Sequence, residues 1–280
     1  MTIDVWDTAT FDPALAAQLD AHADLIRDYL HTDHEIFLSH DLGRGAGRSI
    51  LRQENPYADD FYRLKETIGH AMDVRVIRAF HYTRLIDDEV AALSRDGIQL
   101  STPETLRDRL NAVVSSADLS QEHADKLYAA SPFHSDQIEA RNGKFWMASH
   151  PVPIDDGGVA PLLGCWGGEV ASMWVQDDAL TAPLRGLGKP RIIEVAVPLA
   201  ATRHSYDAGM AVIASFARSH GSIPSKHAFD LYVWWPLSSS SILKVLTEGE
   251  PAFAAMGRSY PVGYHDVDIG RWKELTGDDN

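Results

Sequence analysis

Residues 75–97 read RVIRAFHYTRLIDDEVAALSRDG, and this stretch decides the class of fold that we expect. Its first part, residues 75–83, is rich in β-branched and aromatic side chains and favours a strand. From Ile86 to Ser94 apolar residues recur at helical spacing, with acidic residues at the positive end of the helix dipole and Gly97 just past the last turn. The order strand, turn, helix, glycine predicts a fold in which a sheet and helices pack together.

The same patterns continue on both sides of this stretch. Strands are expected at 144–150, 191–197 and 231–235, and each is followed directly by a proline, which a strand interior rarely tolerates. Helices are expected from Pro13 to about His31, from 103 to 113, from 120 to 127 and from 206 to 220. Asp12 can cap the first, Ser101-Thr102-Pro103-Glu104 gives a capping-box start to the second, and Ser120 opens the third. We therefore predict an α+β protein with a single mixed domain, residues 73–280, and an N-terminal helical extension, residues 1–72.

Composition narrows the classes of function. The 280 residues are 45% hydrophobic, which is typical of a globular chain with a substantial core. The 40 acidic residues outnumber the 25 basic ones, for a formal charge of −15, so broad nucleic-acid binding is disfavoured. A few well-placed arginines can still bind a small nucleotide, because short-range contacts outweigh net charge.

Cellular location is predicted from the cysteine count and from the absence of long apolar runs. Cys165 is the single cysteine, so no disulfide can form within the chain, and this suits a reducing compartment. No run of the sequence approaches 18 uninterrupted apolar residues, and the first residues lack a basic, apolar leader. We expect a cytoplasmic protein that does not bind membranes.

Three segments carry candidate functional side chains. His81 lies at the end of the expected strand, where side chains and helix-start amides can face a common cleft. Glu169 follows two glycines and lies near Trp166, and such a pair can bind a planar cation. Residues 145–150 present alternate side chains to opposite faces of a strand, so one face can line a pocket. A purely structural interpretation stays open for each segment: a core hydrogen bond, a tight turn and aromatic packing.

Other familiar chemistries are less well supported. His31 and His34 share a helix face but lack the His-Glu-x-x-His spacing of zinc hydrolases, so no metal is expected. Cys165 has apolar neighbours and no adjacent basic residue to activate it. The glycine-rich stretch Asp41–Arg48 has two arginines that can meet an anion, yet it lacks the Gly-Lys-Ser/Thr ending of a P-loop.

The sequence FHYTRL at 80–85, followed by Glu89-Val90, Leu93 and Asp96-Gly97-Ile98, resembles the first motif of ADP-ribosyltransferase-like folds. In those families, which include DNA-modifying toxins and relatives of the poly-ADP-ribose polymerases, a strand ending in His-x-Thr leads into a helix closed by a glycine. The match covers about twenty residues. The segment Trp-Gly-Gly-Glu at 166–169 is also similar to a group of uncharacterised bacterial proteins.

The resemblance implies a central, largely antiparallel sheet and NAD as the substrate. It implies that His81 holds the NAD ribose with Thr83 beside it, that residues 144–149 form a second pocket strand, and that Glu169 is the catalytic carboxylate. The full set of implied binding residues is His81, Tyr82, Thr83, Arg84, Trp146, Ser149 and Trp166, and the implied catalytic residues are Glu169 and His81. Glu169 departs from the family pattern because it lacks a Glu-x-Glu or Gln-x-Glu pairing, and no tyrosine marks the second motif, so the acceptor stays open.

Three functions therefore remain under consideration. The first is an NAD-consuming ADP-ribosyltransferase or NAD glycohydrolase, in which Glu169 stabilises the positive charge that develops as the nicotinamide–ribose bond breaks. The second is a non-catalytic protein that binds a nucleotide or small metabolite in the same cleft. The third is a hydrolase of another type that uses a histidine–carboxylate pair.

Overall fold

A computed structural model describes residues 1–39 and 53–265, and the predicted glycine-rich loop Asp41–Arg48 lies outside them. The fold is a mixed α+β arrangement around a six-stranded sheet with the strand order β5-β3-β2-β4-β6, in which β1 adds a short parallel pair to β2 and every other pairing is antiparallel. The strands are β1 (Thr2–Ile3), β2 (Val76–Leu85), β3 (Phe145–Ala148), β4 (Lys189–Pro198), β5 (Asp230–Val233) and β6 (Ile242–Thr247). The α+β class and the largely antiparallel sheet are thereby confirmed.

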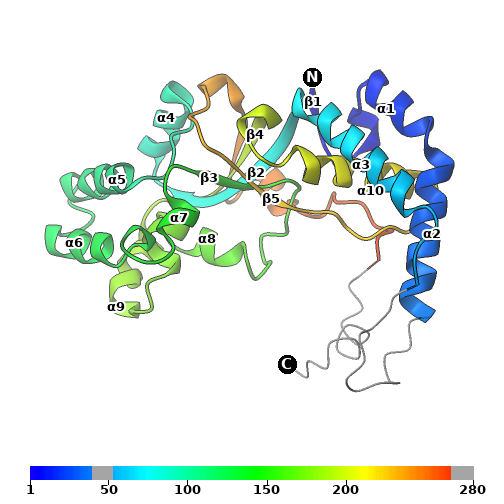
Figure 1. The fold of residues 1–280 in the computed structure, drawn as a ribbon. Helices are drawn as coiled ribbons and strands as arrows, with labels where there is room; N and C mark the ends of the chain where they lie inside the picture. The colour runs from blue at the N-terminus through cyan, green and yellow to red at the C-terminus, as the bar shows by residue number, and fades with distance from the viewer. Residues whose placement is uncertain (40–52, 266–280) are drawn as a thin grey trace, which may run out of the picture.

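The sheet lies between two groups of helices (Figure 1). One group contains α1 (Pro13–Asp20), α2 (Ala23–Ser39), α3 (Ala58–Asp73) and α10 (Ser205–Ser219). The other contains α4 (Asp87–Asp96), α5 (Pro103–Ser115), α6 (Gln121–Ala129), α7 (Ile138–Arg141), α8 (Ala160–Gly164) and α9 (Asp178–Thr181). A short helix, α11 (Pro251–Ala254), follows β6. No helix in the described residues is both long and apolar enough to span a bilayer.

The helix caps predicted at Asp12 and Ser120 are present. Asp12 accepts a hydrogen bond from the Leu15 amide at 2.9 Å, and Ser120 accepts one from the His123 amide. The capping box predicted at Ser101–Glu104 lies one residue later: Thr102 accepts a hydrogen bond from the Thr105 amide, and the Thr105 hydroxyl accepts one from the Thr102 amide. Each side chain satisfies an amide that has no partner inside its helix.

The predicted helix end near His31 is wrong. The helix instead breaks after Asp20, and α2 then runs on to Ser39. The break is stabilised by His22, whose backbone amide bonds to the Leu19 carbonyl and whose Nδ1 bonds to the Gln18 carbonyl. These bonds satisfy carbonyls that the end of α1 would otherwise leave free.

Strand β2 is the centre of the sheet, and its two edges differ. One edge pairs with β4 over its whole length, from Val76↔Pro198 to Leu85↔Lys189. The other edge pairs with β1 at its start and with β3 at a single position, Phe80↔Ala148. The backbone of β2 beyond Phe80 is therefore open to contact from another segment on that side.

The N-terminal residues share one hydrophobic core with the rest of the chain. Ile3, Leu15 and Phe61 belong to the same buried cluster as Ile77 and Val212. In addition, α3 and α10 pack so closely that a Cβ atom at Gly209 would lie 3.0 Å from the backbone of Gly69. Residues 1–72 therefore contribute directly to the support of the sheet.

Candidate functional site

The segment Trp166–Glu169 docks against the open edge of β2. The Gly167 amide donates to the Arg84 carbonyl at 3.4 Å, and the Trp166 amide donates to the Leu184 carbonyl at 3.0 Å. A Cβ atom built on Gly168 would lie 3.5 Å from the hydroxyl of Thr83. Two of the predicted segments, the end of β2 and the Trp-Gly-Gly-Glu turn, are therefore in direct contact.

This turn depends on its glycines. Gly167 has φ +80°, and a side chain there would overlap the Cβ of Ala171. Gly168 has φ +55° and ψ −135°, a combination that L-residues essentially never adopt. The turn leads directly into the short π-helix η3 (Glu169–Met173), so the glycines determine where the Glu169 carboxylate lies.

His81 connects β2 to β3 through its side chain. Its Nδ1 lies 2.8 Å from the Trp146 carbonyl oxygen, and its ring packs against Phe145 with centroids 4.2 Å apart. Because a carbonyl only accepts, Nδ1 carries the proton and Nε2 of the neutral ring is an acceptor. The pKa of His81 is lowered to about 4, chiefly by burial and also by the charge of Arg109, while the bond to Trp146 opposes the change; the ring is therefore neutral at physiological pH. His81 therefore offers an acceptor suited to a ligand hydroxyl.

Glu169 is paired with Arg141, a residue that the sequence analysis did not single out. The two side chains form an ion pair and are only 25% and 17% exposed, respectively. The pKa of Glu169 is raised, chiefly because burial removes its hydration; Arg141 opposes this change and the nearby Asp230 adds to it. The Arg141 guanidinium lies between two indoles, 5.4 Å from the ring centre of Trp146 and 5.8 Å from that of Trp174. Glu169 is thus linked to the strand that His81 contacts.

The energetic terms that hold Arg141 in this position nearly cancel. A partly exposed ion pair contributes up to ~1 kcal/mol, and each contact with an indole face adds ~0.5–1 kcal/mol. Against these, the Arg141 Nε is buried and has no hydrogen-bond partner among the described residues, which costs ~1–3 kcal/mol. The ion pair and its aromatic contacts therefore add little net stability.

A second arginine lies near His81. Arg109, on α5, donates to Glu89 at 2.7 Å and lies 4.8 Å from the ring centre of Trp166. Its Nη2 is buried and has no partner in the part of the chain that the structure describes. Because a buried donor without an acceptor is costly, this atom is a candidate ligand contact. Arg109 was not among the predicted site residues.

Several predicted site residues bond to the protein itself. The Tyr82 hydroxyl accepts from the Val152 amide at 2.6 Å and donates to the Val152 carbonyl at 3.1 Å. Arg84 donates to the carbonyls of Leu187 and Leu163, and the Trp166 indole donates to Glu89 at 2.8 Å. These three side chains hold the elements around the candidate site in place.

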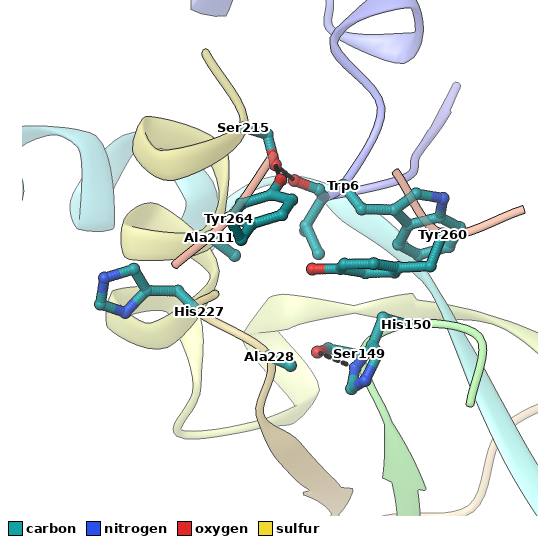
Figure 2. A pocket seen from close by; sticks show the side chains of 10 residues that line it. Trp6, Ser149, His150, Ala211, Ser215, His227, Ala228, Tyr260 and Tyr264 are labelled. Carbon is teal, nitrogen blue, oxygen red and sulfur yellow. Dashed lines mark hydrogen bonds between the residues drawn. The ribbon is translucent and has the colours of Figure 1, made fainter. Parts of the chain in front are cut away.

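Ser149 lines a different hollow, shown in Figure 2. Its hydroxyl accepts from the Phe229 amide at 3.0 Å and lies 3.4 Å from His150 Nδ1. Tyr260 and Tyr264, from the chain after α11, close this hollow (Figure 2). Within residues 1–39 and 53–265 its lining includes Ser149 but neither His81 nor Glu169. The structure therefore places the Trp166–Glu169 turn against Thr83 and Arg84. His81 bonds to the backbone of Trp146, and Arg141 connects the Trp146 ring to Glu169. Ser149 belongs to a separate hollow.

Comparisons with known proteins leave the family unassigned: no family model, no curated protein and no solved structure matches the chain. Among the described residues, no group of three or more histidine, cysteine, aspartate or glutamate side chains is arranged to hold a metal ion. The site itself offers a partly buried carboxylate, a neutral imidazole acceptor, two arginines with a spare donor each, and an indole face.

Proposed function

We propose that the chain is an NAD-consuming ADP-ribosyltransferase or NAD glycohydrolase. The observation that carries the proposal is the docking of the Trp166–Glu169 turn on the end of β2, beside Thr83. It supports a shared site for the His-x-Thr strand and the candidate carboxylate, two segments far apart in the sequence. The ADP-ribosyltransferase-like character of the fold is part of the same proposal.

The polar groups around His81 suit a ribose. A ribose hydroxyl both donates and accepts hydrogen bonds, and the site has one group for each role. The His81 Nε2 accepts from the hydroxyl, and the unpartnered Arg109 Nη2 donates to the sugar or to the adjoining phosphate. Thr83, which is 5% exposed, lies on the same face of β2 as His81.

Of the predicted aromatic residues Tyr82 and Trp146, Trp146 is the better candidate to bind the nicotinamide. The Tyr82 hydroxyl is bound to both backbone groups of Val152, whereas the Trp146 ring already carries a planar cation, the Arg141 guanidinium. The nicotinamide ring of NAD is a planar cation as well, and an indole face attracts such groups.

Glu169 acts on the bond between nicotinamide and ribose. As that bond breaks, its electron pair leaves with nicotinamide and positive charge develops on the sugar, which the nearby carboxylate stabilises. The carboxylate then takes the proton from the incoming nucleophile, which is water in a glycohydrolase and an acceptor group in a transferase. Its raised pKa strengthens it as a base.

The test is release of nicotinamide from NAD by the purified chain. We expect release by the wild type and a loss of about 100-fold or more in E169Q, the range for removal of a general base or of a charge-stabilising group. E139Q, an exposed carboxylate on α7 near the same site, is the matched control and is expected to retain activity. Equal release by wild type and E169Q would remove Glu169 from the mechanism. Stabilisation by NAD without turnover would indicate the non-catalytic binding protein instead.

One observation favours the hydrolase alternative. His204 Nδ1 lies 3.0 Å from the Asp207 carboxylate, and its Nε2 is buried with no partner among the described residues. A carboxylate that orients an imidazole in this way prepares a general base. Activity on ester or phosphoester substrates that H204Q abolishes and E169Q leaves intact would establish this function in place of NAD cleavage.

A further inference from the structure

We propose that Arg141 is a built-in occupant of the cation-binding site formed by Trp146, Trp174 and Glu169, and that it controls access to the Glu169 carboxylate. This inference rests on the proposed function: if NAD is the substrate, its nicotinamide ring is the planar cation that must enter this site. It adds a regulatory element of the site: Arg141 and the substrate compete for the same carboxylate and the same indole faces.

The contacts of Arg141 are those that a planar cationic ligand would make. Its guanidinium is ion-paired with Glu169 and faces the rings of Trp146 and Trp174 at 5.4 and 5.8 Å. A carboxylate combined with aromatic faces is a general receptor for delocalised cations. The buried Nε without a partner among the described residues shows that the receptor satisfies Arg141 incompletely.

The receptor can be reached from solvent. Trp174 is 43% exposed, and Met173 beside it and Ile138 on α7 are 44% and 37% exposed. The backbone that carries Arg141 is anchored, because the Trp146 indole donates to the Ala140 carbonyl at 2.9 Å and Lys144 donates to the Glu139 carbonyl at 2.6 Å. The Glu169 carboxylate can therefore be uncovered by a rotation of the Arg141 side chain alone, with no movement of α7.

Competition has a quantitative consequence. A ligand that needs the open site binds with an affinity reduced by the fraction of molecules in which the site is open. If Arg141 closes the site in about nine molecules of ten, its removal strengthens binding by about tenfold. The gain is larger for a cation than for a neutral ring, because a neutral ring gains only the indole faces, whereas a cation gains the Glu169 carboxylate as well.

The experiment compares two small probes, 1-methylnicotinamide, which is a planar cation, and nicotinamide, which is neutral, by calorimetric titration. We expect R141Q to bind 1-methylnicotinamide about tenfold more tightly than the wild type, and to show a smaller gain for nicotinamide, which does not use the carboxylate. R203Q is the matched control, because Arg203 also lies over an indole, 4.5 Å from the centre of Trp234. R203Q is expected to bind both probes as the wild type does, and the double variant R141Q/E169Q is expected to lose the gain.

A second variant keeps the inference testable if R141Q does not fold. In R141K the ammonium cannot fill the planar space between the indoles, so R141K is also expected to bind the cationic probe more tightly than the wild type. Equal or weaker binding of 1-methylnicotinamide by the folded Arg141 variants overturns the inference. If the wild type still releases nicotinamide from NAD, the proposed function survives that result; if release is absent as well, both fail.

Discussion

The imidazole Nδ1 of His81 lies 2.8 Å from the backbone oxygen of Trp146, so a side chain on β2 supplies a hydrogen bond to the neighbouring strand. The two strands share a single backbone pair, Phe80↔Ala148, and the histidine extends their connection past it. The same bond leaves Nε2 as an acceptor. His81 therefore contributes both to the sheet and to the proposed site, and the two contributions can be separated by mutation.

The substitutions H81N and H81L separate the contribution of His81 to the sheet from its contribution to the proposed site. In H81N the amide nitrogen can still donate to the Trp146 carbonyl, whereas H81L leaves that carbonyl without its donor. We expect H81L to lower the free energy of unfolding by about 1–3 kcal/mol and H81N to lower it less. Urea denaturation measures the free energy of unfolding of both variants. Both variants lack Nε2, so both are expected to weaken NAD binding, and equal destabilisation by the two variants would show that the bond to Trp146 contributes little.

The pH dependence of stability follows from the lowered pKa of His81. In the folded protein that pKa is about 4, whereas an unfolded histidine titrates near 6.5. Between these values the unfolded chain binds the extra proton, so stability is fully present above about pH 6.5 and is lost as the pH falls towards 4. The loss from His81 is at most about 3 kcal/mol.

His150, whose pKa is also lowered to about 4 by burial, adds to the same loss. Urea denaturation at several pH values between 7 and 4.5 checks this, and H81N is expected to have a shallower dependence than the wild type. An unchanged slope in H81N would assign the whole effect to His150 and to other groups.

The glycine turn before Glu169 can be tested with alanine. G168A places a side chain at φ +55° and ψ −135°, and we expect it to destabilise the protein by about 1–3 kcal/mol and to reduce nicotinamide release. Gly164 is the matched control, because a Cβ atom there meets nothing within 4 Å and no positive φ is required. Thermal unfolding of G168A and G164A makes the comparison, and similar melting temperatures would contradict the role given to the turn.

Arg109 is expected to influence the titration of His81 directly. Its positive charge lowers the pKa of His81, so R109Q should raise that pKa, while burial keeps it below the value of a free histidine. Ring-nitrogen NMR of His81 across a pH series provides the measurement. R107Q, which removes an arginine of the same helix that pairs with Asp125, serves as the control and should leave the titration unchanged.

The sequence predicted the features that depend on neighbouring residues. The β2–α4 unit is one example: its strand and helix formed where the side-chain pattern indicated. Gly97 has φ +80°, and a side chain there would collide with the Leu237 carbonyl. The caps Asp12 and Ser120 are others, because an N-cap needs only the amides of the next turn.

The features that depend on distant contacts were not predicted. Strand β6 has exposed residues at Leu243 and Lys244 and follows a run of serines, and it is recognisable only through its pairing with β4. Arg141 carries no local signal at all, since its ion pair with Glu169 exists only after the turn at Gly167 and Gly168 has docked. The candidate site was therefore predicted in its strand and its carboxylate, but not in its two arginines.

The pairing of β2 also determines when during synthesis the sheet can form. The residues that cover its full edge, Lys189–Pro198, lie more than a hundred positions later in the chain, since Val76 pairs with Pro198. On the other side, Thr2 and Ile3 can align only after Val76 and Ile77 have emerged from the ribosome. A nascent chain consequently carries its central strand without its main partner until β4 has been translated, and during that time the unpaired edge of β2 can pair with a strand of another chain.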